Sequence, residues 1–280
     1  MKVDFHTHST ASDGTLSPTE LIGAAEASGV AVLALPAHDT TRGIDAALRA
    51  AQDKQLALSA GAELSGAEPD AEIELHMLGL GVAPENRELQ ETLETLVRAR
   101  RKRAERILAK LAKLGAEIPE SELPDDTSRF TRPHIARALV RTGHCRNVEE
   151  AFGRFLRRGA AAHEPSPGIP SRQAIDAIHA AGGLACLAHA PRSRGTDAAG
   201  GMESFVERLV QRGLDGIETD HPSLKRVQRK NLRRLARRWD LVECFGSDYH
   251  EPARSTGPGV DVGDREALDR LLERLGAQSS

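Results

Sequence analysis

The sequence predicts an α/β fold in which about seven strands form a closed or nearly closed barrel, interrupted by a helical insertion. Three observations predict it. Short apolar runs alternate with longer segments of helical periodicity, which is typical of βα units. The chain's 280 residues are an ordinary length for one α/β barrel. One internal segment, residues 84–170, has helical periodicity but contains no convincing strand.

The alternation sets the order of the barrel elements. Expected strands lie near Lys2–His6, Ala31–Leu35, Leu56–Gly61, Ile73–Leu80, Leu184–Ala188, Gly216–Thr219 and Leu241–Phe245. Expected helices lie near Pro18–Ser28, Ile44–Lys54, Ser171–Ala181, Met202–Arg212, Leu224–Arg238 and Arg265–Leu275. The start Ser17-Pro18 and the stop at Gly29 are ordinary helix boundary signals.

The insertion is expected to form a helical domain of its own. A long basic amphipathic helix is expected from Glu88 to Leu114, and shorter helices near Ile135–Arg141 and Val148–Arg157. The proline-rich stretch Ala162–Ser171 is interpreted as the return linker. We therefore expect residues 1–83 and 171–280 to be the two parts of the barrel and residues 84–170 to cover one end of it.

Composition excludes several classes of protein. A net charge of −3 argues against a general nucleic-acid coat protein, although it allows a small anionic substrate. Three widely spaced cysteines without a CxxC pattern fit a reducing cytosol. No apolar window is long enough to span a membrane, and a polar motif begins already at Asp4. We expect a soluble cytoplasmic protein with no membrane contact and no stable nucleic-acid complex, of open oligomeric state.

Histidines and acids gather where the predicted strands end. Because the carboxyl ends of parallel barrel strands converge on one mouth, these side chains are expected to meet there. Imidazoles with carboxylates suit Mn, Fe or Zn, and the absence of thiolates argues against a structural zinc cage. The candidate ligands of this multinuclear metal site are His6, His8, Asp13, His38, Glu63, His76, His189, Asp248 and His250.

Each candidate alone has an ordinary structural explanation. His76 could be a satisfied histidine of the core, His38 a buried residue at a strand end, and Asp13 a turn residue. A metal site becomes the simplest interpretation because nine such candidates lie at the ends of predicted strands.

The same motifs carry a resemblance that spans essentially the whole chain. DFHTHSTASDG, AHDTTRG, AGAELS, LHMLGLG, LAHAP and GSDYH resemble the PHP (polymerase and histidinol phosphatase) family of metal-dependent phosphoesterases. TRPHIARALV and FLRRG in the insertion resemble the subgroup that removes the 3′-phosphate of nucleoside 3′,5′-bisphosphates and trims short RNA from its 5′ end. The resemblance implies a distorted seven-stranded, TIM-like (βα) barrel with two or three divalent metal ions, whose ligands match the nine candidates.

The implied reaction is hydrolysis of a phosphomonoester by a metal-bridged hydroxide, with no certain side-chain acid or base. The family's phosphate-binding arginine and histidine match Arg132 and His134 in the insertion, where the alternative is a helix cap and a first-turn surface residue. Arg192 matches a further phosphate-binding arginine, with Arg194 as a competitor. Glu218 and His221, in GIETDHPS, resemble a stretch of the family that lines the mouth, and His221 is a weaker substrate candidate.

The run RARRKRAERILAKLAK allows an RNA track as well as an ordinary solvated helix face, and the latter is commoner. Aromatic residues for base stacking near the proposed site are few: Phe130, Phe245 and Tyr249.

One departure from the family lies next to a candidate ligand. The family writes Thr-Asp-His-Asp-Thr where this chain has Pro36 and Ala37 before His38. The missing aspartate is a candidate outer support for a ligand, so the sequence predicts that Ala37→Asp raises metal affinity or turnover. Two alternative functions stay open: a phosphatase for another small phosphomonoester, and a non-catalytic metal- or nucleotide-binding module.

Overall fold

The computed structural model describes residues 1–68, 73–123, 130–166, 168–190, 201–251 and 257–278. The chain separates into two compact units. Unit 1 contains residues 1–93 and 168–280, and unit 2 contains residues 94–167. The insertion expected from the sequence comprised residues 84–170. The compact unit 2 begins later and ends earlier than that segment.

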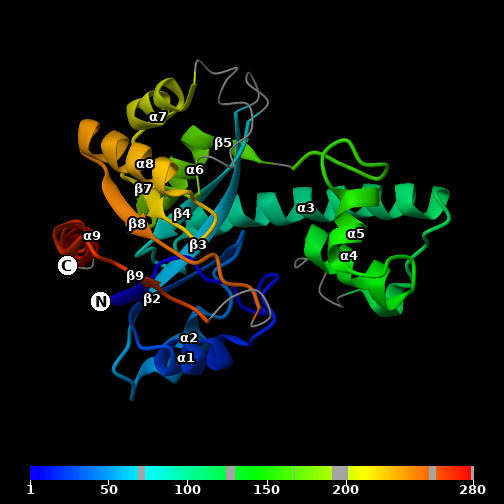
Figure 1. Cartoon of the computed structure of the whole chain (residues 1–280), viewed down its shortest axis with the longest axis horizontal. Coiled ribbons are helices and arrows are strands. Elements are labelled where there is room, and N and C mark those ends of the chain that lie inside the picture. The colour runs from blue at the N-terminus through cyan, green and yellow to red at the C-terminus, as the bar shows by residue number, and fades with distance from the viewer. Residues whose placement is uncertain (69–72, 124–129, 167, 191–200, 252–256, 279–280) are drawn as a thin grey trace. The chain divides into compact units, whose positions relative to one another are not determined.

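Unit 1 is a mixed α/β fold around one curved sheet (Figure 1). In the described residues the order along the sheet is β8-β7-β6-β4-β3-β2-β1-β9, and β5 pairs with β3. The strands are β1 (Lys2–Asp4), β2 (Val30–His38), β3 (Ala57–Glu68), β4 (Ile73–Leu80), β5 (Ile169–Pro170), β6 (Leu184–Leu187), β7 (Gly216–Asp220), β8 (Val242–Phe245) and β9 (Val260–Asp261). All seven expected strands are present, and β5 and β9 are two further short ones.

The sheet is less parallel than the sequence predicted. β4 runs antiparallel to both of its neighbours, β3 and β6. Only residues 69–72 separate β3 from β4, and a parallel crossover needs a dozen or more residues, so this connection allows only a hairpin.

Hydrogen bonds between the two ends of the main sheet nearly close it into a barrel. The amide of Phe5 donates to the carbonyl of Phe245 at 2.8 Å, just beyond β1 and β8. Further along, the backbone amide of Asp248 donates to the carbonyl of His6 at 2.8 Å. The backbone amide of His8 donates to the carbonyl of Tyr249, also at 2.8 Å. These bonds place the segments after β1 and β8, which carry candidate ligands, side by side.

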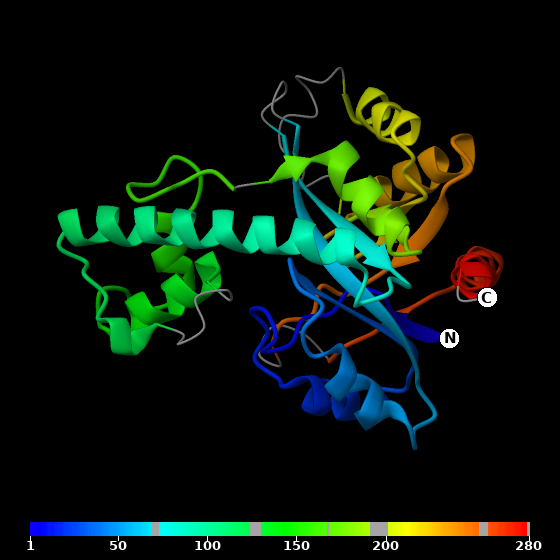
Figure 2. The ribbon, with the colours of Figure 1, turned by 180° about the vertical axis from the view of Figure 1, so that it is seen from behind.

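Helices lie on the outside of this sheet (Figures 1 and 2). They are α1 (Pro18–Ala27), α2 (Ile44–Ala51), α6 (Ser171–Ala180), α7 (Gly201–Gln211), α8 (Arg226–Arg238) and α9 (Arg265–Gln278). Leu21 and Ile22 of α1 pack with Leu33 and Leu35 of β2, whereas Ala34 belongs to the apolar cluster inside the barrel. The alternation of β2 therefore turns its odd-numbered residues to the helices and its even-numbered residues to the interior.

Unit 2 is helical in its described residues. α3 (Arg87–Lys113) begins in unit 1 and continues into unit 2, followed by α4 (Arg132–Arg141), α5 (Val148–Ala151) and two short segments, η2 (Glu120–Glu122) and the π-helical η4 (Phe152–Leu156). Its core contains Ile107, Leu111, Leu139 and Leu156. Leu114, the expected last residue of the long helix, lies just beyond α3 and is 49% exposed.

Candidate metal centre

Glu63 lies at the centre of a cluster of five histidines. Its Oε1 lies 2.7 Å from His76 Nδ1 and 3.4 Å from both His6 Nε2 and His189 Nε2. Its Oε2 lies 2.8 Å from His38 Nδ1 and 3.4 Å from His8 Nε2. The expectation that Glu63 follows the end of its strand is wrong, because β3 continues to Glu68. Glu63 sits in mid-strand opposite His38, the last residue of β2, where the sheet backbone fixes it.

A second carboxylate, Asp248, faces His6 and His8 from the other end of the sheet. Its Oδ1 lies 3.5 Å from His6 Nε2 and 3.2 Å from His8 Nε2. Close approach here requires Gly246, since a Cβ at that position would lie 2.3 Å from His6 Cβ and 2.7 Å from an oxygen of Glu218. The glycine of the GSD motif thus allows the β1 and β8 segments to meet.

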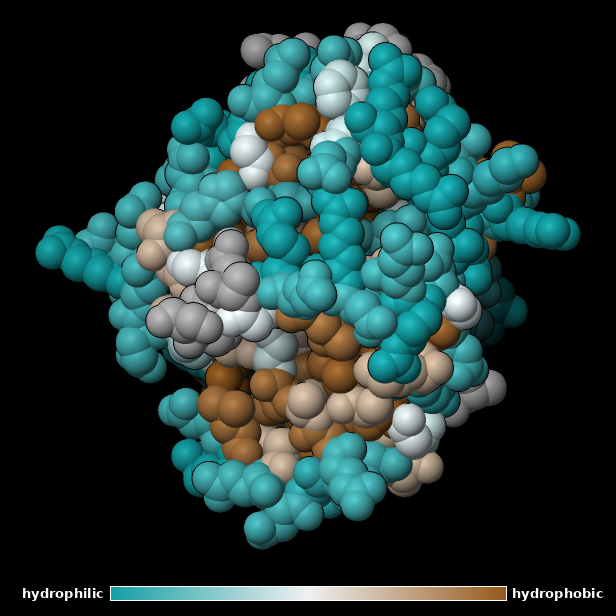
Figure 3. All heavy atoms as spheres, turned by 90° about the vertical axis from the view of Figure 1, so that its left-hand side faces the viewer, coloured by the Kyte–Doolittle hydropathy of each residue, from teal (hydrophilic) through white to brown (hydrophobic). Residues whose placement is uncertain are grey.

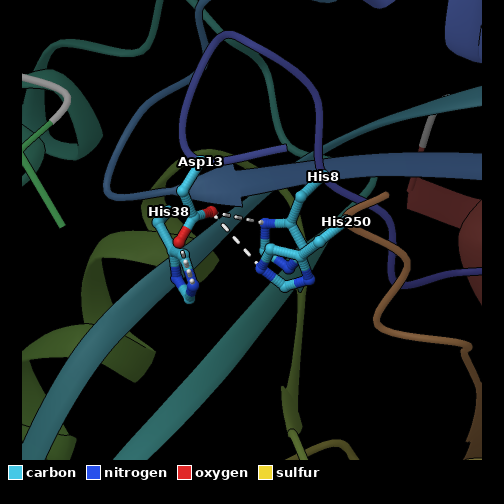
Figure 4. Close-up of side chains that lie close together, drawn as sticks. All are labelled: His8, Asp13, His38 and His250. Atoms are coloured by element: carbon cyan, nitrogen blue, oxygen red, sulfur yellow. Dashed lines mark ion pairs between the residues drawn. The ribbon is translucent and has the colours of Figure 1, made fainter. Parts of the chain in front are cut away.

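Asp13 gathers a third group of imidazoles. Figure 4 shows its carboxylate pointing to His8 and His250 on one side and His38 on the other. The distances from its oxygens are 3.3 Å to His250 Nε2, 3.8 Å to His8 Nδ1 and 3.9 Å to His38 Nε2. The turn that carries Asp13 is tight, because a Cβ on Gly14 would lie 2.5 Å from the carbonyl oxygen of His8.

The structure brings all nine candidate residues together. They form four overlapping groups, in each of which one potential ligand atom per residue lies within 4.8 Å of the others. The groups are His8, Asp13, His38 and His250; His6, His8 and Asp248; His6, Glu63 and His189; and His38, Glu63 and His76. Shared members make this one continuous cluster.

Two members of the cluster and one neighbour adopt backbone angles that side chains disfavour. His189, Asp248 and Asp39 have φ values of 56°, 54° and 51°. Asp39 is held by Ser65, whose amide donates to Oδ1 at 2.7 Å and whose hydroxyl donates to Oδ2 at 3.0 Å. Such strained residues persist where the surroundings hold them in place, as they often do at functional sites.

Electrostatics favour ionised carboxylates surrounded by imidazoles. Burial would raise the pKa of Glu63, but the nearby His38, His76 and His6 outweigh it and hold that pKa well below its usual range. Burial likewise opposes ionisation of Asp248, and His6 foremost keeps its pKa low. Burial, together with the neighbouring His250 and His38, lowers the pKa of His8 to about 3. A deprotonated imidazole beside charged carboxylates is a ready metal-binding arrangement.

Buried polar atoms in the cluster fit a metal ion better than they fit one another. His6 Nε2, His8 Nε2, His76 Nδ1 and both Glu63 oxygens are buried without a hydrogen-bond partner in the described residues. Buried polar groups are normally satisfied, so unsatisfied donors and acceptors converging on one place require a different partner. Divalent cations bound among these residues would satisfy them.

An outer layer of polar contacts, which the sequence did not reveal, orients the inner residues. Glu218 Oε1 lies 3.1 Å from His6 Nδ1, so that His6 directs Nε2 at Glu63. A carboxylate behind an imidazole is the usual support of a metal-binding histidine. Asp4 accepts bonds from Ser247 and Gly259 and so joins the β1 and β8 segments; burial raises its pKa to about 6. The sequence signal for Glu218 was an acid inside an expected strand, whereas its partner His6 could not be known from the sequence.

The substrate candidates differ in what the structure places beside the cluster. His221 is buried, and its Nε2 lies 3.5 Å from Asp248 Oδ2, while Nδ1 accepts from the amide of Ser223 at 3.1 Å. In unit 2, Arg132 begins α4, and His134 forms a capping box with Thr131. Arg192 and its competitor Arg194 lie outside the described residues.

Ala37 does not support His38. It lies on the helix-facing side of β2, the opposite side from His38, and is 1% exposed. Pro36 is tolerated because β1 pairs with β2 only as far as Leu33. The expectation that an aspartate at position 37 improves the metal site therefore lacks a geometric basis, because its carboxylate would enter the layer under the helices.

Relatives with known names show what kind of protein this is. The chain is 39% identical over 274 residues to a 5′-3′ exoribonuclease of Haemophilus influenzae, covering 94% of this chain and 96% of that protein. It is 31% identical over 281 residues to a 3′,5′-nucleoside bisphosphate phosphatase of Chromobacterium violaceum, covering 98% and 94%. A structure from Bifidobacterium adolescentis described as a metal-dependent phosphoesterase superposes with a TM-score of 0.85 at 28% identity, covering 97% and 95%. No model of a known protein family matches the chain.

Fold and cluster together define a phosphoric ester hydrolase of the metal-dependent class. The chain belongs to the PHP family of metal-dependent phosphoesterases, together with the exoribonuclease and bisphosphate phosphatase relatives. None of the described helices is both long and apolar enough to cross a membrane.

Proposed function

We propose that this enzyme hydrolyses the 3′-phosphate of nucleoside 3′,5′-bisphosphates, or the 5′ end of short oligoribonucleotides, at the cluster around Glu63. The observation that carries the proposal is the position of Glu63, with five imidazoles within 3.4 Å of its two oxygens. The names of the relatives supply the substrate class, since they act on nucleoside bisphosphates and on RNA.

The proposed ligands are the nine residues His6, His8, Asp13, His38, Glu63, His76, His189, Asp248 and His250. Two or three ions of Mn, Fe or Zn held by them would activate a water molecule and stabilise charge on the phosphoryl group. Glu63 and Asp248 balance the positive charge of such ions, and Glu218 holds the ring of His6 in position. The finer architecture proposed for unit 1 is the family's distorted seven-stranded barrel, with β5 and β9 as additions.

His221 is a proposed substrate contact. Because Nδ1 accepts from Ser223, the neutral ring carries its proton on Nε2, which faces Asp248. We propose that this N–H donates to an oxygen of a phosphate bound at the cluster. Arg132, His134 and Arg192 are proposed to bind a second phosphate, for which arginine's planar fork is well suited.

Phosphate release from three substrates tests the proposal. Purified protein with Mn²⁺ is given adenosine 3′,5′-bisphosphate, 5′-AMP and p-nitrophenyl phosphate, with Glu63→Gln as the negative control. We expect the bisphosphate to be hydrolysed fastest. Equal rates on all three substrates would overturn the substrate assignment, and unchanged release by Glu63→Gln would overturn the site.

A further inference from the structure

α8 is the most concentrated positive charge in a described element of unit 1. Its thirteen residues, RVQRKNLRRLARR, contain seven cations and no acid. The cations repeat at every turn of the helix, which rises about 5.4 Å per turn. Leu232, Leu235 and Ala236 are buried against the sheet, so the cations lie on the remaining faces.

A groove of about 900 Å³ runs along these cations. Its lining consists of Leu224, Arg226, Arg229, Lys230, Asn231, Arg233, Arg234 and Arg237, without an acidic residue. Figure 3 faces the side of unit 1 on which α8 lies in Figure 1, and hydrophilic side chains predominate in its upper part, with smaller hydrophobic patches between them. The groove therefore has the volume and the positive lining to accommodate an extended anion.

Acids behind the groove fix some of the cations and leave others available. Arg229 and Arg233 pair with Asp220 at 2.7 and 3.3 Å, Arg234 pairs with Glu203 at 3.0 Å, and Arg237 lies 3.7 Å from Asp264. Arg226 and Lys230 are exposed and form no ion pair in the described residues. Arg226 and Lys230 can therefore form ion pairs with a negatively charged ligand in the groove.

Contacts connect one end of the groove to the metal cluster. Arg229 donates through Nη2 to the carbonyl of His221 at 3.2 Å. His221 in turn lies 3.5 Å from Asp248 through its ring. His221 thus links Arg229, in the first turn of α8, to Asp248 of the cluster. From this point α8 runs along the outside of the barrel.

We propose that the α8 groove binds the phosphodiester backbone of a single-stranded RNA whose 5′ end lies at the metal cluster. The placement of the RNA 5′ end at the metal cluster rests on the proposed function. Binding of the RNA backbone in the groove does not require hydrolysis. Cations without aromatic residues bind phosphates rather than bases, so the groove holds RNA of any sequence and releases it as salt rises. The RNA track that the sequence allowed lies on α3 instead, where Arg103 donates to the carbonyl of Glu164.

Fluorescence anisotropy with labelled dodecauridylate tests the groove in EDTA, where no hydrolysis occurs. The logarithm of the binding constant is plotted against the logarithm of salt concentration for the full-length protein and for Arg226→Ala/Lys230→Ala. We expect the slope to become shallower by about 1.4, at about 0.7 for each lost phosphate contact. Uridine 5′-monophosphate is too short to follow the groove, so its binding constant should be the same in the parent and the variant. The ratio of the binding constants of dodecauridylate and uridine 5′-monophosphate should therefore be smaller in the variant.

The matched control is Arg49→Ala/Lys54→Ala, which removes two cations near α2 in the same unit. It should keep the parent slope. Equal slopes in parent and groove variant, or equal losses in groove and control variants, would overturn the proposal. Loss of binding to phosphatidylserine vesicles without loss of RNA binding would also overturn it, in favour of a membrane surface. Failure of the proposed function has a different signature: no phosphate release from the bisphosphate, with the salt slopes unaffected.

Discussion

At the scale of single residues, Glu63 explains why scattered histidines converge. It lies in a regular strand, so its carboxylate is fixed by the sheet, and five imidazoles from other segments surround it. A carboxylate buried without a hydrogen-bond partner is costly unless cations compensate for it. The residue is therefore an organiser of the cluster as well as a proposed ligand.

Glu218 is expected to act through His6. Glu218→Gln removes the charge behind the His6 ring, so metal affinity should fall by about 10–100-fold, the usual effect of losing such a support. Titration of metal-free protein with Mn²⁺ measures it. Glu243→Gln is the control, because Glu243 is also buried but bonds to Thr219. Affinities that fall equally in both variants would mean a general effect on the sheet.

Ala37→Asp is expected to destabilise the protein. The new carboxylate would be buried on the helix-facing side of β2, and an unsatisfied buried polar group costs about 1–3 kcal/mol. Urea unfolding measures the change, with Ala37→Ser as a smaller polar control. Unchanged stability together with tighter metal binding would restore the expectation drawn from the sequence.

These residues show how far sequence could lead. The nine candidates lie in recognisable motifs rich in histidine and acids, so their clustering could be predicted from the sequence. The direction in which Ala37 points was not, because a motif does not state which strand face it lies on. The partnership of Glu218 and His6 joins residues 212 positions apart and depends on the closure of the sheet.

At the scale of elements, the strands and helices were predictable where periodicity was strong, as in α3 and α9. The antiparallel β4 was not, because apolar alternation does not give direction, although the short connection after β3 excluded a crossover. The two-residue strands β5 and β9 are too short to leave a periodic signal. The charge of α8 was visible in the sequence, but its groove depends on which helix faces are buried.

The contact between α6 and the start of β7 predicts a pH dependence. His179 Nε2 lies 2.7 Å from Asp215 Oδ2, and this hydrogen bond foremost raises the pKa of His179 above 6.5. A raised folded-state pKa adds stability below the unfolded pKa and loses it as pH rises through the folded value.

His179→Gln should therefore be less stable than the parent protein at pH 6, with the difference narrowing by pH 9. Melting temperatures across that range measure it. His144→Gln serves as the control, since His144 contacts a backbone carbonyl rather than a carboxylate. A difference that widens with pH would contradict the assignment.

At the scale of the whole molecule, the near-closure of the sheet makes the cluster possible. The segments that follow β1 and β8 are joined by backbone hydrogen bonds, and they carry five of the nine candidate residues: His6, His8, Asp13, Asp248 and His250. The hairpin of β3 and β4 supplies Glu63 and His76 from the opposite part of the sheet. The fold class followed from the sequence, whereas the strand directions and the extent of the two units needed the structure.

We propose that this cluster holds more than one metal ion. Elemental analysis of protein reconstituted with Mn²⁺ and freed of excess metal tests it most directly, with Glu63→Gln and His38→Ala as site variants and Asp176→Asn, an acid on the surface of α6, as the control. We predict at least two bound ions per chain in the parent and in Asp176→Asn, and fewer in both site variants. A single ion or none in the parent, or the same metal content in all four proteins, would contradict the account.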